Sequence, residues 1–123
     1  MPNKLFLVHW NPAEAEQLAE GLRTAGWLVE VEAGDGQRAC RRILADLPLA
    51  VLNYLTRLPS HGRKTAANLR TRPGGASLPI LFVGGSGEVQ QKTIEAVPDA
   101  RFLTPDSLAG ALKDLASTGK TSA

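Results

Sequence analysis

A chain of 123 residues has the usual size of one domain, long enough to bury a hydrophobic core without metals or disulfide bonds. No apolar run approaches the roughly 20 residues that a membrane-spanning helix needs, so we expect no membrane partner. The net charge is +2, and the single cysteine, Cys40, cannot form an internal disulfide, which favours a cytoplasmic location.

The charges are distributed unevenly along the chain. No Asp or Glu occurs from Leu47 to Gly87, although this segment carries five cations: Arg57, Arg63, Lys64, Arg70 and Arg72. Six of the twelve acidic residues lie in the first 35 positions: Glu14, Glu16, Glu20, Glu30, Glu32 and Asp35. We therefore expect one basic and one acidic face.

The first elements alternate strands with helices. Lys4 to Trp10 is strand-like and short, which favours a first strand over a signal peptide. Asn11 can cap a helix, Pro12 suits its first position, and Gly26 ends it. Residues 27–33 then alternate apolar with acidic side chains, which predicts a strand with one solvated face.

The middle of the chain continues this alternation. Asp35 can cap a second helix, which Pro48 stops. Residues 49–55 are apolar nearly throughout, which predicts a strand buried on both faces. A third helix is predicted from about His61 to Thr71, and the sequence Arg-Pro-Gly-Gly at 72–75 ends it.

The last third contains two more strands and helices. Residues 78–85 predict the fourth strand, Ser86 can cap the next helix, and Pro98 closes it. Residues 100–104 predict a short fifth strand, and a final helix is marked by Leu108, Leu112 and Leu115. We expect one domain over residues 1–117 and a flexible tail over residues 118–123.

Five strands that alternate with five helices predict an α/β fold with right-handed crossovers and a parallel sheet. The second and fifth strands are the more polar or shorter ones and belong at the edges, which gives the order 2-1-3-4-5. Functional groups then gather where the strands end.

Over roughly residues 4–117 the sequence resembles the receiver domain of response regulators. The resemblance rests on the order of elements, on Leu58, Pro59 and Gly62 after the third strand, and on Phe-Leu-Thr-Pro at residues 102–105. It implies a flavodoxin-like three-layer sandwich that works in signalling. It also implies acids after strand one and an aspartate at the end of strand three, which together bind Mg²⁺. The same aspartate would accept a phosphoryl group. The resemblance further implies a hydroxyl after strand four and a lysine before the proline that follows strand five, which would contact the phosphoryl group.

This sequence departs from that pattern at every position. The first strand ends in His-Trp-Asn at 9–11 and the third in Asn-Tyr-Leu at 53–55. Gly84 stands where the hydroxyl belongs, and Thr104 where the lysine belongs. We therefore predict no metal site, no cofactor and no catalytic residue. The predicted degenerate receiver pocket consists of His9, Trp10, Asn11, Asn53, Tyr54, Thr56, Gly84 and Thr104. Our hypothesis is that Trp10 and Tyr54, with Asn53 and Thr56, fill this pocket and hold one conformation.

Two other segments admit a binding function. Backbone N–H groups at Gly85, Ser86 and Gly87 could hold an anion, although a tight turn that needs glycine is the favoured interpretation. The basic segment of Arg57, Arg63, Lys64, Arg70 and Arg72 could meet an acidic protein or nucleic acid, although a solvated face is favoured. His9 and His61 lack partners for a metal site or a catalytic triad, and we expect His9 near the surface and His61 in a turn.

The resemblance and the missing acids together favour a phosphorylation-independent pseudo-receiver that acts through a protein partner or as a homodimer. The alternatives are a small module that binds an anion or nucleotide at Gly84–Gly87, and a nucleic-acid accessory protein that uses residues 57–72. An enzyme is the least expected class, because no nucleophile, base and orienting group converge at one strand end.

Overall fold

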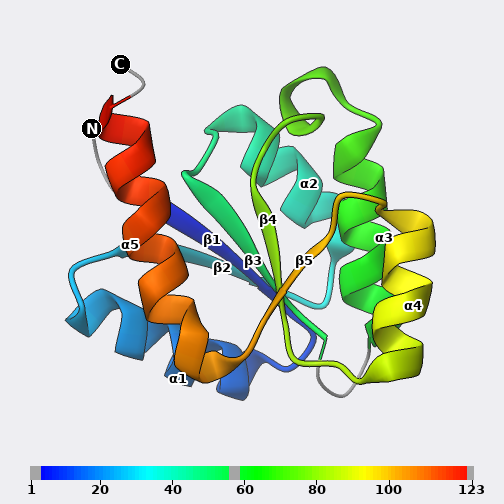
Figure 1. The fold of residues 1–123 in the computed structure, drawn as a ribbon, viewed down its shortest axis with the longest axis horizontal. Helices are drawn as coiled ribbons and strands as arrows, with labels where there is room; N and C mark the ends of the chain where they lie inside the picture. The colour runs from blue at the N-terminus through cyan, green and yellow to red at the C-terminus, as the bar shows by residue number, and fades with distance from the viewer. Residues whose placement is uncertain (1–3, 56–58, 122–123) are drawn as a thin grey trace.

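The computed structural model describes residues 4–55 and 59–121. Five parallel strands form one sheet in the order β2-β1-β3-β4-β5, and five helices cover it (Figure 1). The strands are β1 (Lys4–His9), β2 (Leu28–Ala33), β3 (Ala50–Tyr54), β4 (Ile80–Val83) and β5 (Arg101–Leu103). The helices are α1 (Pro12–Thr24), α2 (Gly36–Ala45), α3 (Pro59–Arg70), α4 (Gly87–Ala96) and α5 (Pro105–Thr121), with a short 3₁₀ turn, η1 (Pro73–Gly75). The predicted three-layer α/β sandwich and its strand order are confirmed.

The helices divide between the two faces of the sheet. In Figure 1, α1 and α5 lie on one side, and α2, α3 and α4 lie on the other. Alternate residues of the central strands face each layer: Phe6, Val51 and Phe82 pack toward α2, α3 and α4, whereas Leu7 and Leu52 pack toward α1 and α5. Each strand of the pair β1 and β3 therefore supplies both halves of the core.

The predicted helix caps are confirmed at two of three positions. The Asn11 side chain accepts a hydrogen bond from the Glu14 N–H at 3.0 Å, and Asp35 accepts one from the Arg38 N–H at 3.0 Å. Ser86 stands at the cap position of α4, but its side chain makes no capping hydrogen bond. This part of the prediction was wrong, because a suitable residue type at a helix start does not fix the rotamer that a cap requires.

Two helix ends differ from the predicted ones. α3 begins at Pro59, earlier than expected. α5 continues to Thr121, so the helix extends beyond residue 117, where we placed the start of the tail. The division into a domain over 1–117 and a flexible tail stays a prediction. Among the described residues, no helix is long and apolar enough to span a lipid bilayer.

Arg70 ties three segments together at the end of α3. Its Nη1 donates to the carbonyls of Gly75 at 2.6 Å and Leu78 at 2.8 Å, and its Nε and Nη2 donate to the Asp99 carboxylate at 3.2 and 2.9 Å. The planar guanidinium satisfies several acceptors that a lysine could not reach at once. Arg70 therefore holds the loops that lead into β4 and β5.

We expect Arg70→Ala to lower the free energy of unfolding by about 2–3 kcal/mol, because two backbone carbonyls and a carboxylate lose a charged donor. Urea denaturation followed by circular dichroism measures this. Arg41→Ala, an exposed position on α2, is the matched control and should change stability by no more than about 0.5 kcal/mol. Equal effects of the two substitutions would contradict the assignment.

Candidate functional site

The candidate site lies at the edge of the sheet where the parallel strands end. β1 ends at His9 and β3 at Tyr54, and these strands are neighbours. The chain leaves β1 toward β2 on one side and returns to β3 on the other, which makes this point the topological switch of the sheet. Sheets of this class bind ligands at such a point.

His9 is buried at this edge rather than near the surface, with 1% of its area exposed. The prediction was wrong because β1 is a central strand that α1 covers. The His9 Nδ1 accepts a hydrogen bond from the Asn11 N–H at 2.9 Å, and its Nε2 lies 3.5 Å from Glu14 Oε2. An imidazole that accepts at Nδ1 carries its hydrogen on Nε2, so the ring points that N–H toward the carboxylate.

Trp10 does not fill the predicted pocket, because 45% of its area is exposed. Trp10 lies past the end of β1, in the bend that leads to α1, whereas Leu5 to His9 within the strand are buried on both faces of the sheet. Tyr54 is buried, and its ring centre lies 5.5 Å from that of His9. Thr56 lies outside the described residues. The hypothesis that Trp10 fills the pocket was therefore wrong, and Tyr54 borders a hollow of about 430 Å³.

Leu55 is the residue that sequence reasoning missed. It follows β3, is 1% exposed, and packs on the face of the sheet that α3 and α4 cover. Its N–H donates to the Val83 carbonyl at 3.0 Å, which extends the pairing with β4. A Cβ added at Gly85 would lie 3.2 Å from Leu55 Cδ1. An alkyl side chain thus occupies the space beneath the loop between β4 and α4.

Asn53 is fully buried and points to the same face as Leu55. Its Nδ2 donates to the Gly62 carbonyl at 2.9 Å, which ties β3 to α3. Its Oδ1 has no hydrogen-bond partner among the described residues. Asn53 therefore acts as a neutral link between strand and helix.

The loop after β4 adopts the conformation that glycine supplies. Gly84 and Gly85 have φ values of 86° and 87°, in the left-handed region. This geometry supports the tight-turn interpretation, and an anion site at Gly85, Ser86 and Gly87 stays a prediction.

Thr104 caps α5. Its N–H donates to Ser107 Oγ at 3.0 Å, and the Ser107 N–H donates to Thr104 Oγ1 at 3.2 Å. Thr104, at the position where the receiver pattern has a lysine, thus caps the N-terminus of α5.

One residue of the predicted basic segment is engaged in internal contacts, and another is not described. The Arg70 guanidinium donates to the Gly75 carbonyl and to the Asp99 carboxylate, and Arg57 lies outside the described residues. Lys64 and Arg72 are exposed, and Arg63 is partly buried. The acids of β2 are neutralised locally, since Glu30 and Glu32 pair with cations of α2 and β1: Arg38, Arg42 and Lys4.

Among the described residues, three of the hollows concern the site and its surroundings. One of about 430 Å³ borders His9 and Tyr54 at the switch point, and another of about 350 Å³ lies between α2 and α3. The latter is lined by His61, whose buried Nε2 has no partner among the described residues and whose pKa is lowered by burial. His61 lies in the first turn of α3, not in a turn between elements.

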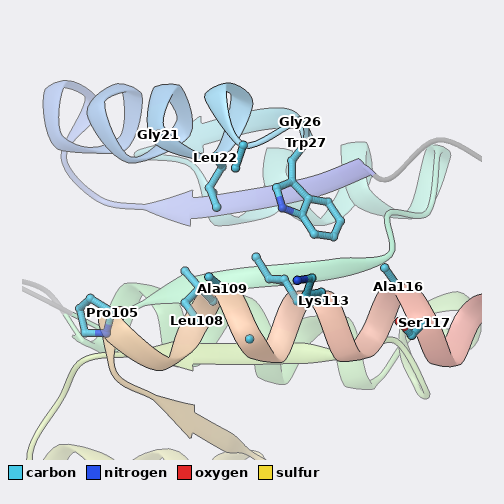
Figure 2. A pocket seen from close by; sticks show the side chains of 13 residues that line it. Gly21, Leu22, Gly26, Trp27, Pro105, Leu108, Ala109, Lys113, Ala116 and Ser117 are labelled. Atoms are coloured by element: carbon cyan, nitrogen blue, oxygen red, sulfur yellow. The ribbon is translucent and has the colours of Figure 1, made fainter.

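The third hollow is an open groove of about 780 Å³ between α1 and α5. Leu22 and Trp27 face Leu108 and Ala109 across it (Figure 2). Among the described residues, no cluster of three or more His, Cys, Asp or Glu side chains could hold a metal ion.

We expect Gly62→Ala to destabilise the protein by about 2–3 kcal/mol, because the added Cβ would meet Asn53 Oδ1. Combining it with Asn53→Ala should recover at least about 1 kcal/mol relative to the sum of the single changes, since the smaller side chain makes room. Urea denaturation measures the cycle. Gly21→Ala is the control, because nothing lies within 4 Å of a Cβ there. If the stability losses of the two single substitutions simply add in the double variant, the close approach of β3 and α3 at Asn53 and Gly62 is contradicted.

No protein-family model matches this sequence, and a search of curated proteins found no relative. Solved structures do share its fold. The chemotaxis protein CheY4 of Vibrio cholerae is 20% identical, with 94% of this chain and 99% of that chain covered and a TM-score of 0.76. The receiver domain of a sensor histidine kinase from Pseudomonas aeruginosa, solved with a magnesium ion in its active-site cleft, is 22% identical, with coverage of 94% and 98% and a TM-score of 0.77.

A chain from the complex of histidine kinase ThkA with response regulator TrrA is 19% identical, with coverage of 94% and 98% and a TM-score of 0.72. These likenesses extend over nearly the whole of each chain, and they agree with the strand order and helix placement described above. The chain therefore has the fold of receiver domains.

Proposed function

We propose that this receiver-like chain is a pseudo-receiver that works through protein–protein contact and without phosphorylation. The observation that supports it most is the chemistry of the two central strand ends. β1 ends in a buried imidazole at His9, and β3 ends in Tyr54 followed by the buried alkyl side chain of Leu55. Neither strand end presents a carboxylate.

Phosphoryl transfer to a protein side chain needs a nucleophile and a divalent cation that neutralises the charge of the phosphoryl oxygens. Mg²⁺ takes oxygen ligands, preferably carboxylates. A carboxylate beside the end of β1 is that of Glu14, which lies 3.5 Å from His9 Nε2. The Asn53 amide carries no charge and is fully buried. Among the described residues, the site therefore offers neither a carboxylate at the end of β3 nor a cluster of metal ligands.

A protein partner is favoured by an exposed aromatic side chain at the same edge. Trp10 follows β1 and is 45% exposed, and large aromatic residues often anchor protein interfaces. Ile94 on α4 is also exposed and belongs to the segment Val89 to Leu115, where we place homodimer contacts. The similar fold found in a complex with a histidine kinase is compatible with a protein partner. We place the protein in the cytoplasm.

Nucleic acid is the less favoured partner. Binding to it rests on several exposed cations that neutralise phosphates. Of the predicted basic segment, Arg70 is engaged in internal hydrogen bonds, and Lys64 and Arg72 are exposed. Few cations therefore remain for a phosphate backbone in the described part of that segment.

We expect no covalent phosphorylation when the purified chain is incubated with acetyl phosphate and MgCl₂, because no carboxylate ends β3. Intact-mass spectrometry checks this, and a magnesium-binding receiver domain serves as the positive control. A mass gain of one phosphoryl group on this chain, dependent on Mg²⁺, would overturn the proposal.

Affinity capture of the tagged chain from its native lysate tests the mode of contact. We expect specific proteins that survive nuclease, are reduced at least about fivefold by Trp10→Ala, and are retained by Leu28→Ala, an exposed apolar position on β2. Recovery that disappears with nuclease and in the Arg63→Glu, Lys64→Glu variant would instead support nucleic-acid binding.

A further inference from the structure

The outer surface that α2 and α3 share carries three exposed cations. The two helices pack side by side in one layer of the sandwich (Figure 1). Arg41 lies on α2, Lys64 lies on α3, and Arg72 follows the end of α3; all three residues are exposed. Burial raises the pKa of the Cys40 thiol on α2, and the charge of Arg72 opposes that rise, so the Arg72 guanidinium lies near α2. We call these three residues the α2–α3 cations.

The cations follow the seam between the two helices. The hollow of about 350 Å³ marks this seam, and Gln37 lines it from α2 while Lys64 and Asn68 line it from α3. Residues four apart on a helix are neighbours on its surface, so Arg41 continues the row that Gln37 begins. Arg72 stands four residues after Asn68, just past the end of α3. The positive charges are therefore gathered on one face.

The acids near this face are already engaged by other cations. Asp35, which also borders the hollow, lies 3.7 Å from the Arg38 guanidinium, and Asp46 lies 2.6 Å from Lys4 Nζ. No acidic residue occurs in the segment from Leu47 to Gly87. Among the described residues, the α2–α3 cations form no ion pair. The face thus attracts negative charge from outside the chain.

Exposed apolar surface adjoins the cations. Leu47, just after α2, is 52% exposed. A Cβ added at Gly74 would lie 3.3 Å from Leu44 Cδ2 and 3.7 Å from Leu47 Cδ2, so both leucines border the turn that follows Arg72. Apolar contact ringed by charged groups is typical of protein interfaces. Nucleic acid fits less well, because three cations are few for a phosphate backbone.

We propose that the α2–α3 face binds an acidic peptide segment of a partner protein. Its carboxylates pair with the α2–α3 cations, and one large aliphatic side chain of the peptide packs on Leu47. This inference rests on the proposed protein–protein function, to which it adds a surface and the chemistry of the partner segment.

Backbone amide NMR of the ¹⁵N-labelled chain at low ionic strength tests the inference with three capped peptides. The first is acetyl-Glu-Glu-Leu-Glu-Glu-amide, the second has Ser in place of Leu, and the third has Lys in place of each Glu. We expect the first to shift the amides of Arg41, Leu47 and Arg72 with a roughly millimolar Kd. The serine peptide should bind about threefold more weakly, because it buries less apolar area. The lysine peptide should give no saturable shifts, and added NaCl should weaken the acidic peptides.

Variants of the chain separate the two kinds of contact. Arg41→Ala combined with Arg72→Ala should weaken the acidic leucine peptide about tenfold, since each exposed pair contributes a factor of about three. Leu47→Ser should weaken the leucine peptide about threefold and leave the serine peptide unchanged. Arg101→Ala, which removes an exposed cation on β5, is the matched control and should change neither affinity. Thermal denaturation shows that each variant remains folded.

Several results would overturn the inference. Equal binding of the acidic and lysine peptides, unchanged binding in the double arginine variant, or no saturable shifts with any peptide would each do so. Tighter binding of a single-stranded oligothymidylate than of the acidic peptide, lost in the double variant, would assign the face to nucleic acid instead. The two proposals fail separately: phosphorylation by acetyl phosphate would refute the pseudo-receiver, whereas absent or charge-independent peptide binding refutes this inference alone.

Discussion

The fold and the site both depend on β3 being buried on both faces. Each of its five residues is buried, so alternate side chains must fit two different layers of helices. Tyr54 faces α1 and α5 and meets His9, whereas Asn53 and Leu55 face α3 and α4. A charged side chain at position 53, 54 or 55 would lose its hydration. This desolvation costs roughly several kcal/mol unless a nearby group of opposite charge compensates it. The structure has neutral groups there instead.

This arrangement connects stability with the proposed absence of phosphorylation. Leu55 packs where the loop between β4 and α4 closes over the sheet, and Asn53 links β3 to α3 through the Gly62 carbonyl. Both contacts hold α3 and that loop in one arrangement. The proposed pseudo-receiver therefore presents a constant surface to its partner, while the pocket on the other face of the sheet remains open.

Much of the fold could be predicted from the sequence, because periodicity, caps and breakers are local signals. Asn11 and Asp35 illustrate this, since each caps the helix that follows it. The site was harder to predict, because burial depends on tertiary neighbours. Nothing near His9 in the sequence indicates that α1 covers it, and nothing near Arg70 indicates that Asp99 lies beside it. Leu55 could have been found by extending the two-residue period of β3 from Asn53.

The central claim is that the strand ends have lost the magnesium site of the receiver fold. A titration of the ¹⁵N-labelled chain with MgCl₂, followed by backbone amide NMR, tests this most directly. The account predicts no saturable shifts at residues 9–11 and 53–55 at millimolar Mg²⁺, beyond those that an equal ionic strength of NaCl produces. Saturable shifts at these residues, specific to the divalent cation, would contradict it.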